Sequence, residues 1–133
     1  MKLNLAIGLG AGMLLAAGAA SAHHSFAMFD QKKTVSLVGV VREFQWTNPH
    51  SFIELDVAGP AGAAEHWSVE MNSPNNLKRQ GWSRVSLKPG DKVTCLINPL
   101  REGKQGGLFI AVTLPDGKVL GDATRAATTA DRL

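Results

Sequence analysis

The chain has 133 residues, of which 44% are hydrophobic and 19% charged, with a formal net charge of +3 at pH 7. This length is enough for one small domain with a single modest core. So small a positive charge gives no reason to expect nucleic acid or an anionic membrane surface as a partner.

The first 22 residues have the layout of a secretory signal peptide. Lys2 gives a positive start, residues 5–17 are apolar and uncharged, and Ala20 and Ala22 have the small side chains that a signal peptidase accepts. The apolar run is too short to hold a membrane span as well as a cleavage site, and we expect no membrane span in the mature chain. Cleavage between Ala22 and His23 predicts a periplasmic or secreted protein whose mature chain begins with two histidines.

A leading arm and a long strand follow the cleavage point. Residues 23–33 are expected to form the N-terminal arm. Residues 34–46 predict a strand, because β-branched and aromatic residues are frequent there. Gly39, just before two consecutive valines, indicates a bulge or sharp bend in the middle of this strand, of the kind that small barrels need.

Two shorter strands are predicted next from their alternating pattern. Residues 52–57 alternate between apolar and acidic side chains, and residues 65–71 alternate between apolar and polar ones. The alternation places Glu54, Asp56 and Glu70 on outward faces, where we expect them to be solvated.

A short helix and two further strands complete the predicted domain. Ser73 suits the N-cap, Pro74 the first helical position and Gly81 the position after the last turn. The remaining strands are expected over residues 92–98, 108–114 and, as a short addition, 118–120. Residues 121–133 are small, polar and aperiodic, and predict a flexible tail.

Three strands, a short helix and two more strands give the element order of a five-stranded OB barrel. The bent first strand agrees with this fold, because it would be shared between both halves of the barrel. The predicted fold is therefore all-β with one short helix, a small five-stranded OB-like barrel over residues 34–120. A small all-β sandwich or an open roll would give a similar pattern.

Several short motifs are distinctive in combination. They are His-His-Ser-Phe at 23–26, the long strand at 34–46, Trp-Thr-Asn-Pro-His at 46–50, Trp-Ser-Val-Glu at 67–70, Ser-Pro-Asn at 73–75 and Leu-Lys-Pro-Gly-Asp at 87–91. Together they resemble a family of small exported bacterial proteins that is catalogued as a domain of unknown function. The resemblance covers nearly all of residues 23–120. It implies a bacterial, exported, single-domain protein and brings no established activity.

The histidines are the strongest candidates for chemistry. A mature chain starting at His23 would join a free amine to an imidazole on one residue, and the amine, with an unperturbed pKa of about 7.7–8, loses its proton easily near neutral pH. His24 and His50 would supply further nitrogens, with His66 in reserve, and nitrogen ligands of this kind suit Cu(II) best. The first hypothesis is therefore a copper-binding protein. Its alternative is that terminal histidines bind metal adventitiously while His50 only bonds within its turn.

The second hypothesis is a metal-free interaction module. Trp46, the turn that contains Asn48, and Trp67 with Glu70 would then form a surface for a periplasmic protein, peptide or glycan. Core packing is the competing role for Trp67. The chain shows no nucleophile–base pair, nucleotide-binding loop or nucleophile elbow, so we do not expect an enzyme.

Cys95 is the only cysteine, so it has no partner for an intramolecular disulfide. Strand alternation puts it on the same face as Val93 and Ile97, which predicts a buried and unreactive thiol. A metal-ligand or redox role is the alternative.

Overall fold

The computed structural model describes residues 26–131, so the leader, its cleavage site, His23 and His24 lie outside the described residues. The elements, in chain order, are β1 (Val35–Gln45), β2 (Phe52–Ala58), β3 (Ala64–Glu70), α2 (Pro74–Arg79), β4 (Lys92–Pro99), β5 (Gly106–Thr113), β6 (Val119–Gly121) and α3 (Ala123–Ala130). Every predicted strand is present within two residues of its expected bounds. The predicted helix is also present, with the side chain of Ser73 as its N-cap.

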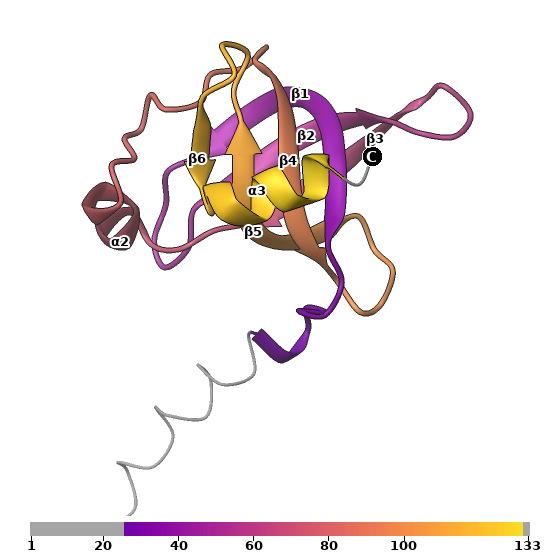
Figure 1. The fold of residues 1–133 in the computed structure, drawn as a ribbon, viewed down its shortest axis with the longest axis horizontal. Helices are drawn as coiled ribbons and strands as arrows, with labels where there is room; N and C mark the ends of the chain where they lie inside the picture. The colour runs from indigo at the N-terminus through magenta and orange to yellow at the C-terminus, as the bar shows by residue number, and fades with distance from the viewer. Residues whose placement is uncertain (1–25, 132–133) are drawn as a thin grey trace, which may run out of the picture.

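The strands close into a barrel (Figure 1). The antiparallel order β3-β2-β1-β4-β5 is completed by a parallel pairing between β3 and β5, and β6 adds a short strand beside β5. This order and closure, with α2 between β3 and β4, are those of the predicted five-stranded OB-like barrel. Neither a two-sheet sandwich nor an open roll has such a closure.

An irregularity in β1 lets this strand serve both halves of the barrel. Its first half pairs with β4 and its second half with β2, and the register with β2 shifts between Val41 and Glu43. Arg42, the extra residue in this interval, marks the bulge predicted for the middle of the strand. Gly39 lies close to the neighbouring strand, because a Cβ at this position would be 2.7 Å from the backbone oxygen of Asp56.

The interior of the barrel is filled by the apolar residues of the alternating strands. Ile53 and Leu55 of β2 are fully buried, and Met71 after β3 is buried as well. Trp46 and Trp67 are partly buried and pack against this core. The core cluster consists of Leu37, Val41, Ile53, Leu55, Val69, Met71, Leu77, Trp82, Leu87, Val93, Cys95, Ile97 and Val112.

The C-terminal segment contains a helix that the sequence pattern did not indicate. Within the expected tail, α3 begins where the side chain of Asp122 accepts a hydrogen bond from the backbone N–H of Arg125 at 3.0 Å. Ala126 packs against a second buried cluster, formed by Leu96, Ile110 and Ala111. The cap and this packing offset the low helix propensity of the three threonines of α3. No helix within residues 26–131 is long and apolar enough to cross a membrane.

Cys95 is the buried thiol that strand alternation predicts, and burial raises its pKa from 9.0 to about 12. We therefore expect no reaction of the native protein with Ellman's reagent, and reaction of one thiol per chain after unfolding in guanidinium. Because the folded pKa lies above the unfolded value, the thiol's contribution to stability is constant below pH 9 and is lost as the pH rises towards 12. Equal reaction rates for native and unfolded protein would contradict this assignment.

Candidate functional site

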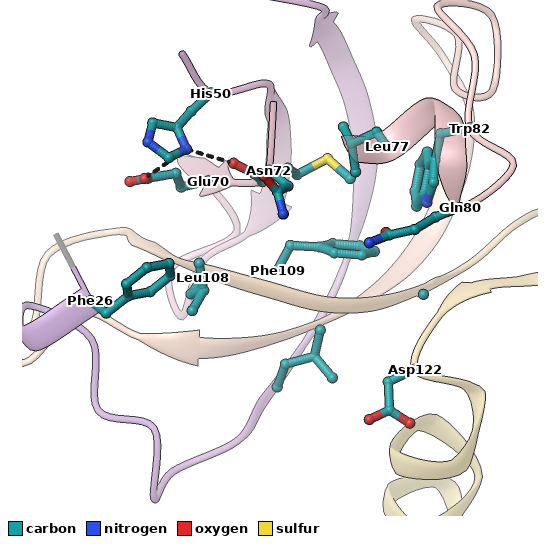
Figure 2. A pocket seen from close by; sticks show the side chains of 13 residues that line it. Phe26, His50, Glu70, Asn72, Leu77, Gln80, Trp82, Leu108, Phe109 and Asp122 are labelled. Carbon is teal, nitrogen blue, oxygen red and sulfur yellow. Dashed lines mark hydrogen bonds and ion pairs between the residues drawn. The ribbon is translucent and has the colours of Figure 1, made fainter. Parts of the chain in front are cut away.

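A cavity of about 470 Å³ lies between the end of β3, the segment around α2, and β5 (Figure 2). Its walls are mainly apolar and include Leu77, Trp82 and Phe109. Polar groups converge on it from separate parts of the chain: His50, Glu70, Asn72, Gln80 and Asp122. A volume in this range with a few polar groups is typical of sites for small molecules.

His50 and Glu70 form one polar end of the cavity (Figure 2). Nδ1 of His50 lies 3.0 Å from the backbone oxygen of Met71 and 3.5 Å from Oε1 of Glu70. Because a carbonyl oxygen only accepts hydrogen bonds, the neutral imidazole carries its hydrogen on Nδ1. Its Nε2 then holds a lone pair that can accept a hydrogen bond or bind a metal ion.

The turn that carries His50 is fixed by hydrogen bonds on both sides. The hydroxyl of Thr47 donates to the backbone oxygen of His50 at 2.8 Å, and the Asn48–Pro49 peptide bond is cis. After the turn, the backbone of Ser51 exchanges hydrogen bonds with the segment that follows β3. These bonds tie the start of β2 to the end of β3, which places His50 beside Glu70.

The N-terminal arm reaches the same cavity. Phe29 is buried and pairs with Leu100 in an isolated bridge. Arg101 donates from its backbone N–H to Met28 and from Nε to Ala27, both at 2.9 Å. Phe26, the first described residue, lines the cavity and is half-exposed. The described part of the arm therefore reaches the cavity that His50 also lines.

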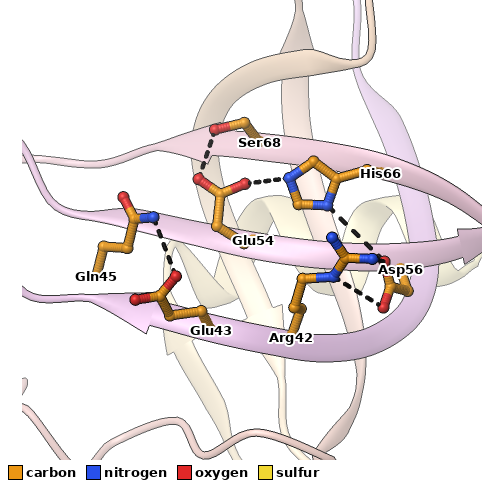
Figure 3. Close-up of polar contacts among 7 residues, drawn as sticks. All are labelled: Arg42, Glu43, Gln45, Glu54, Asp56, His66 and Ser68. Carbon is orange, nitrogen blue, oxygen red and sulfur yellow. Dashed lines mark hydrogen bonds and ion pairs between the residues drawn. The ribbon is translucent and has the colours of Figure 1, made fainter.

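His66 lies elsewhere, in a polar network on the outer face of β2 and β3 (Figure 3). Its Nε2 is 2.7 Å from Oε2 of Glu54 and its Nδ1 is 3.8 Å from Oδ1 of Asp56. His66 precedes Glu70 by four residues along β3, or about 13 Å at the rise of an extended strand, so the structure does not bring it to the cavity. Across residues 26–131, no group of three or more His, Cys, Asp or Glu side chains is placed to hold a metal ion.

Glu54 differs from the solvated carboxylate expected at this position. It does lie on the outward face, but it is only 8% exposed. The hydroxyl of Ser68 donates to it at 2.9 Å, and His66 covers its other oxygen. Arg42, from the bulge of β1, holds Asp56 at 3.0 Å in the same network (Figure 3). We assign this polar network a structural role in joining β1, β2 and β3.

The second predicted set of residues is not assembled at one place. Trp46 and Trp67 pack against the core, and the indole N–H of Trp67 donates to Glu65. Asn48 is exposed on its turn, and Glu70 alone of this set lines the cavity.

Three further polar residues line the cavity, and none of them was predicted as a site residue: Asn72, Gln80 and Asp122. Asn72 and Gln80 flank the helix that Ser73 and Gly81 delimit, so the helix signals were the available pointer to them. Asp122 is the N-cap of α3, and an aspartate at this place was the available signal, but the aperiodic residues after it predicted a flexible tail.

A family of unknown function (DUF6152) matches residues 11–110 of the chain. The matched range includes β1 to β4, α2 and the start of β5, together with His50 and Glu70. No curated protein and no solved structure matches the chain.

Proposed function

The chain belongs to this family of unknown function, and we propose from its own residues that it is a small exported binding protein that holds copper between its mature N-terminus and His50. The ligands would be the amine and imidazole of His23, the imidazole of His24 and Nε2 of His50. The observation that supports this proposal most directly is that Phe26, two residues after His24, lines the same cavity as His50. Export rests on the leader and on cleavage between Ala22 and His23.

The covalent chain keeps the N-terminal ligands within reach of the cavity. An extended chain spans at most about 3.6 Å per residue, so the α-carbon of His24 is within about 7 Å of that of Phe26. Phe26 belongs to the arm, and the residues just after it are held against the β4–β5 hairpin by Arg101 and by the buried Phe29. A mature N-terminus would therefore leave the folded domain at the cavity that His50 also lines.

The surroundings of His50 favour metal binding through Nε2. Histidine ligands usually donate their other ring N–H to a carbonyl or carboxylate, which fixes the ring and raises its basicity. Met71 and Glu70 supply such acceptors to Nδ1 of His50. An amine and three imidazoles form a nitrogen-rich set, and such a set binds Cu(II) more tightly than the other divalent ions of the first transition row.

The test is a Cu(II) titration of the mature chain that begins at His23, followed by the visible d–d band and by competition with a chelator of known affinity. We expect one tight site per chain, and we expect His50→Ala to weaken it by about tenfold or more. An additional methionine before His23 removes the free amine from that residue and should have a similar effect. His66→Ala is the matched control and should leave the affinity unchanged, because His66 lies on the outer face.

Two results would overturn the proposal. The first is a Cu(II) affinity that neither His50→Ala nor the additional methionine changes. The second is a dissociation constant of the wild-type chain for Cu(II), obtained from the competition with the chelator, that is micromolar or weaker. Circular dichroism of each variant shows whether the barrel is intact, so that lost affinity is not confused with lost folding.

A further inference from the structure

The cavity extends well beyond the edge that the proposed copper site would use. In Figure 2, His50 and Glu70 lie at one end, while Gln80 and Trp82 lie at the other. Phe109 lines the space between them, and Trp82 packs edge-on against its ring at 5.4 Å. A metal ion at His50 would leave this apolar part of the cavity free for a second ligand.

The side chain of Phe26 is partly exposed to water, and an apolar ligand in the cavity would cover it. Its side chain lines the cavity next to Leu108 (Figure 2) and is 50% exposed. An apolar group that entered the cavity would cover this ring and remove apolar surface from water, which is favourable. The shape and the lining therefore suit a ligand with an apolar body.

The charge of the lining indicates what else the ligand carries. Glu70 and Asp122 contribute carboxylates from β3 and from the start of α3, and among residues 26–131 no lysine or arginine lines the cavity. Oε1 of Glu70 lies 3.5 Å from Nδ1 of His50 at the same end of the cavity (Figure 2). Carboxylates beside apolar walls attract cations and repel anions more strongly than they would in open water.

We infer that this cavity binds a small organic cation with an apolar body, of the class of protonated aromatic and alkyl amines. The ammonium group would lie against a carboxylate at one end, and the apolar body would fill the space between Phe26 and Phe109. Aromatic rings near the ammonium would add a cation–π contribution. This ligand needs no metal, so the inference stands apart from the copper proposal.

The test uses three probes of similar size on the mature protein in the presence of EDTA: 2-phenylethylammonium, the neutral 3-phenylpropan-1-ol and the anionic 3-phenylpropanoate. Binding is measured by calorimetry and by amide chemical shifts. The cation is expected to bind at least tenfold more tightly than the anion, with the neutral alcohol between them. The largest shifts should fall on Phe26, Leu108 and Phe109.

Charge-neutral variants then identify the carboxylates. Glu70→Gln and Asp122→Asn should each weaken binding of the cation several-fold, and asparagine still caps α3. Glu102→Gln is the matched control, because it removes the same charge from an exposed hairpin loop outside the cavity. Asp122→Asn should leave the Cu(II) affinity unchanged, which separates this inference from the copper proposal.

The inference fails if the cation and the anion bind equally, or if the cation shows no saturable binding at millimolar concentration. It also fails if the double variant with Glu70→Gln and Asp122→Asn keeps the preference of the wild-type chain for the cation. If the wild-type chain bound the organic cation but did not bind copper, the proposed function would be wrong and this inference would stand.

Discussion

Replacement of Trp82 by alanine is expected to lower the free energy of unfolding by about 3–5 kcal/mol, the range for removal of a large buried aromatic side chain. Trp82 is 3% exposed and belongs to the core cluster. Its ring lies 5.4 Å from that of Phe109 and 6.0 Å from that of Phe44, so its removal also ends two aromatic contacts. Urea unfolding followed by circular dichroism measures the loss.

Val85 provides the control for this substitution. It follows Trp82 by three residues and is 73% exposed, so Val85→Ala should change the free energy of unfolding by less than about 0.5 kcal/mol. Because Trp82 also lines the cavity, its loss should weaken binding of the organic cation as well. A loss of stability below about 1 kcal/mol for Trp82→Ala would mean that the indole is not part of the packed core.

The strands and the helix α2 could be predicted because their signals are local. Alternation in residues 52–57 identifies β2 without knowledge of any partner strand, and the same holds for β3. Ser73 and Gly81 mark the ends of α2 through backbone requirements that depend only on the helix itself. The bulge in β1 was indicated by Gly39, although the extra residue is Arg42.

The cavity could not be predicted, because it depends on pairing between distant segments. Phe26, Glu70, Phe109 and Asp122 come together only after β3 closes against β5 and the arm packs against the β4–β5 hairpin. The element order predicted a closed barrel, but it did not indicate which side chains line the space between β3, α2 and β5 or where the arm packs. The burial of Glu54 could not be predicted for the same reason, because it depends on the strand register that places Ser68 directly opposite it.

The helix α3 shows how tertiary contacts override weak local preferences. Its sequence, Ala-Thr-Arg-Ala-Ala-Thr-Thr-Ala, contains residues of poor helix propensity and lacks a basic last turn. Isolated helices of this length are not stable in water. The cap from Asp122 and the contact of Ala126 with the second core cluster supply what the sequence pattern lacks.

Phe29 is the residue through which the fold and the proposed copper site are most directly connected. Phe29→Ala is expected to lower the free energy of unfolding by about 3 kcal/mol, the lower end of the range for a buried phenylalanine, because the arm can detach instead of leaving an empty cavity. Phe29 is 2% exposed, whereas the neighbouring Met28 is 48% exposed. Met28→Ala is therefore the matched control and should change stability little in urea unfolding.

The same variant should also reduce the Cu(II) affinity of the mature chain by about tenfold, since a detached arm lowers the effective concentration of its ligands near His50. The reduction would occur although Phe29 offers no ligand atom, and Met28→Ala should not cause it. A Phe29→Ala chain that stays folded and keeps the wild-type copper affinity would show that the N-terminal histidines bind copper without His50. If the Phe29→Ala chain showed the d–d band of the wild type at saturating copper, the site would reassemble once the metal draws the arm back.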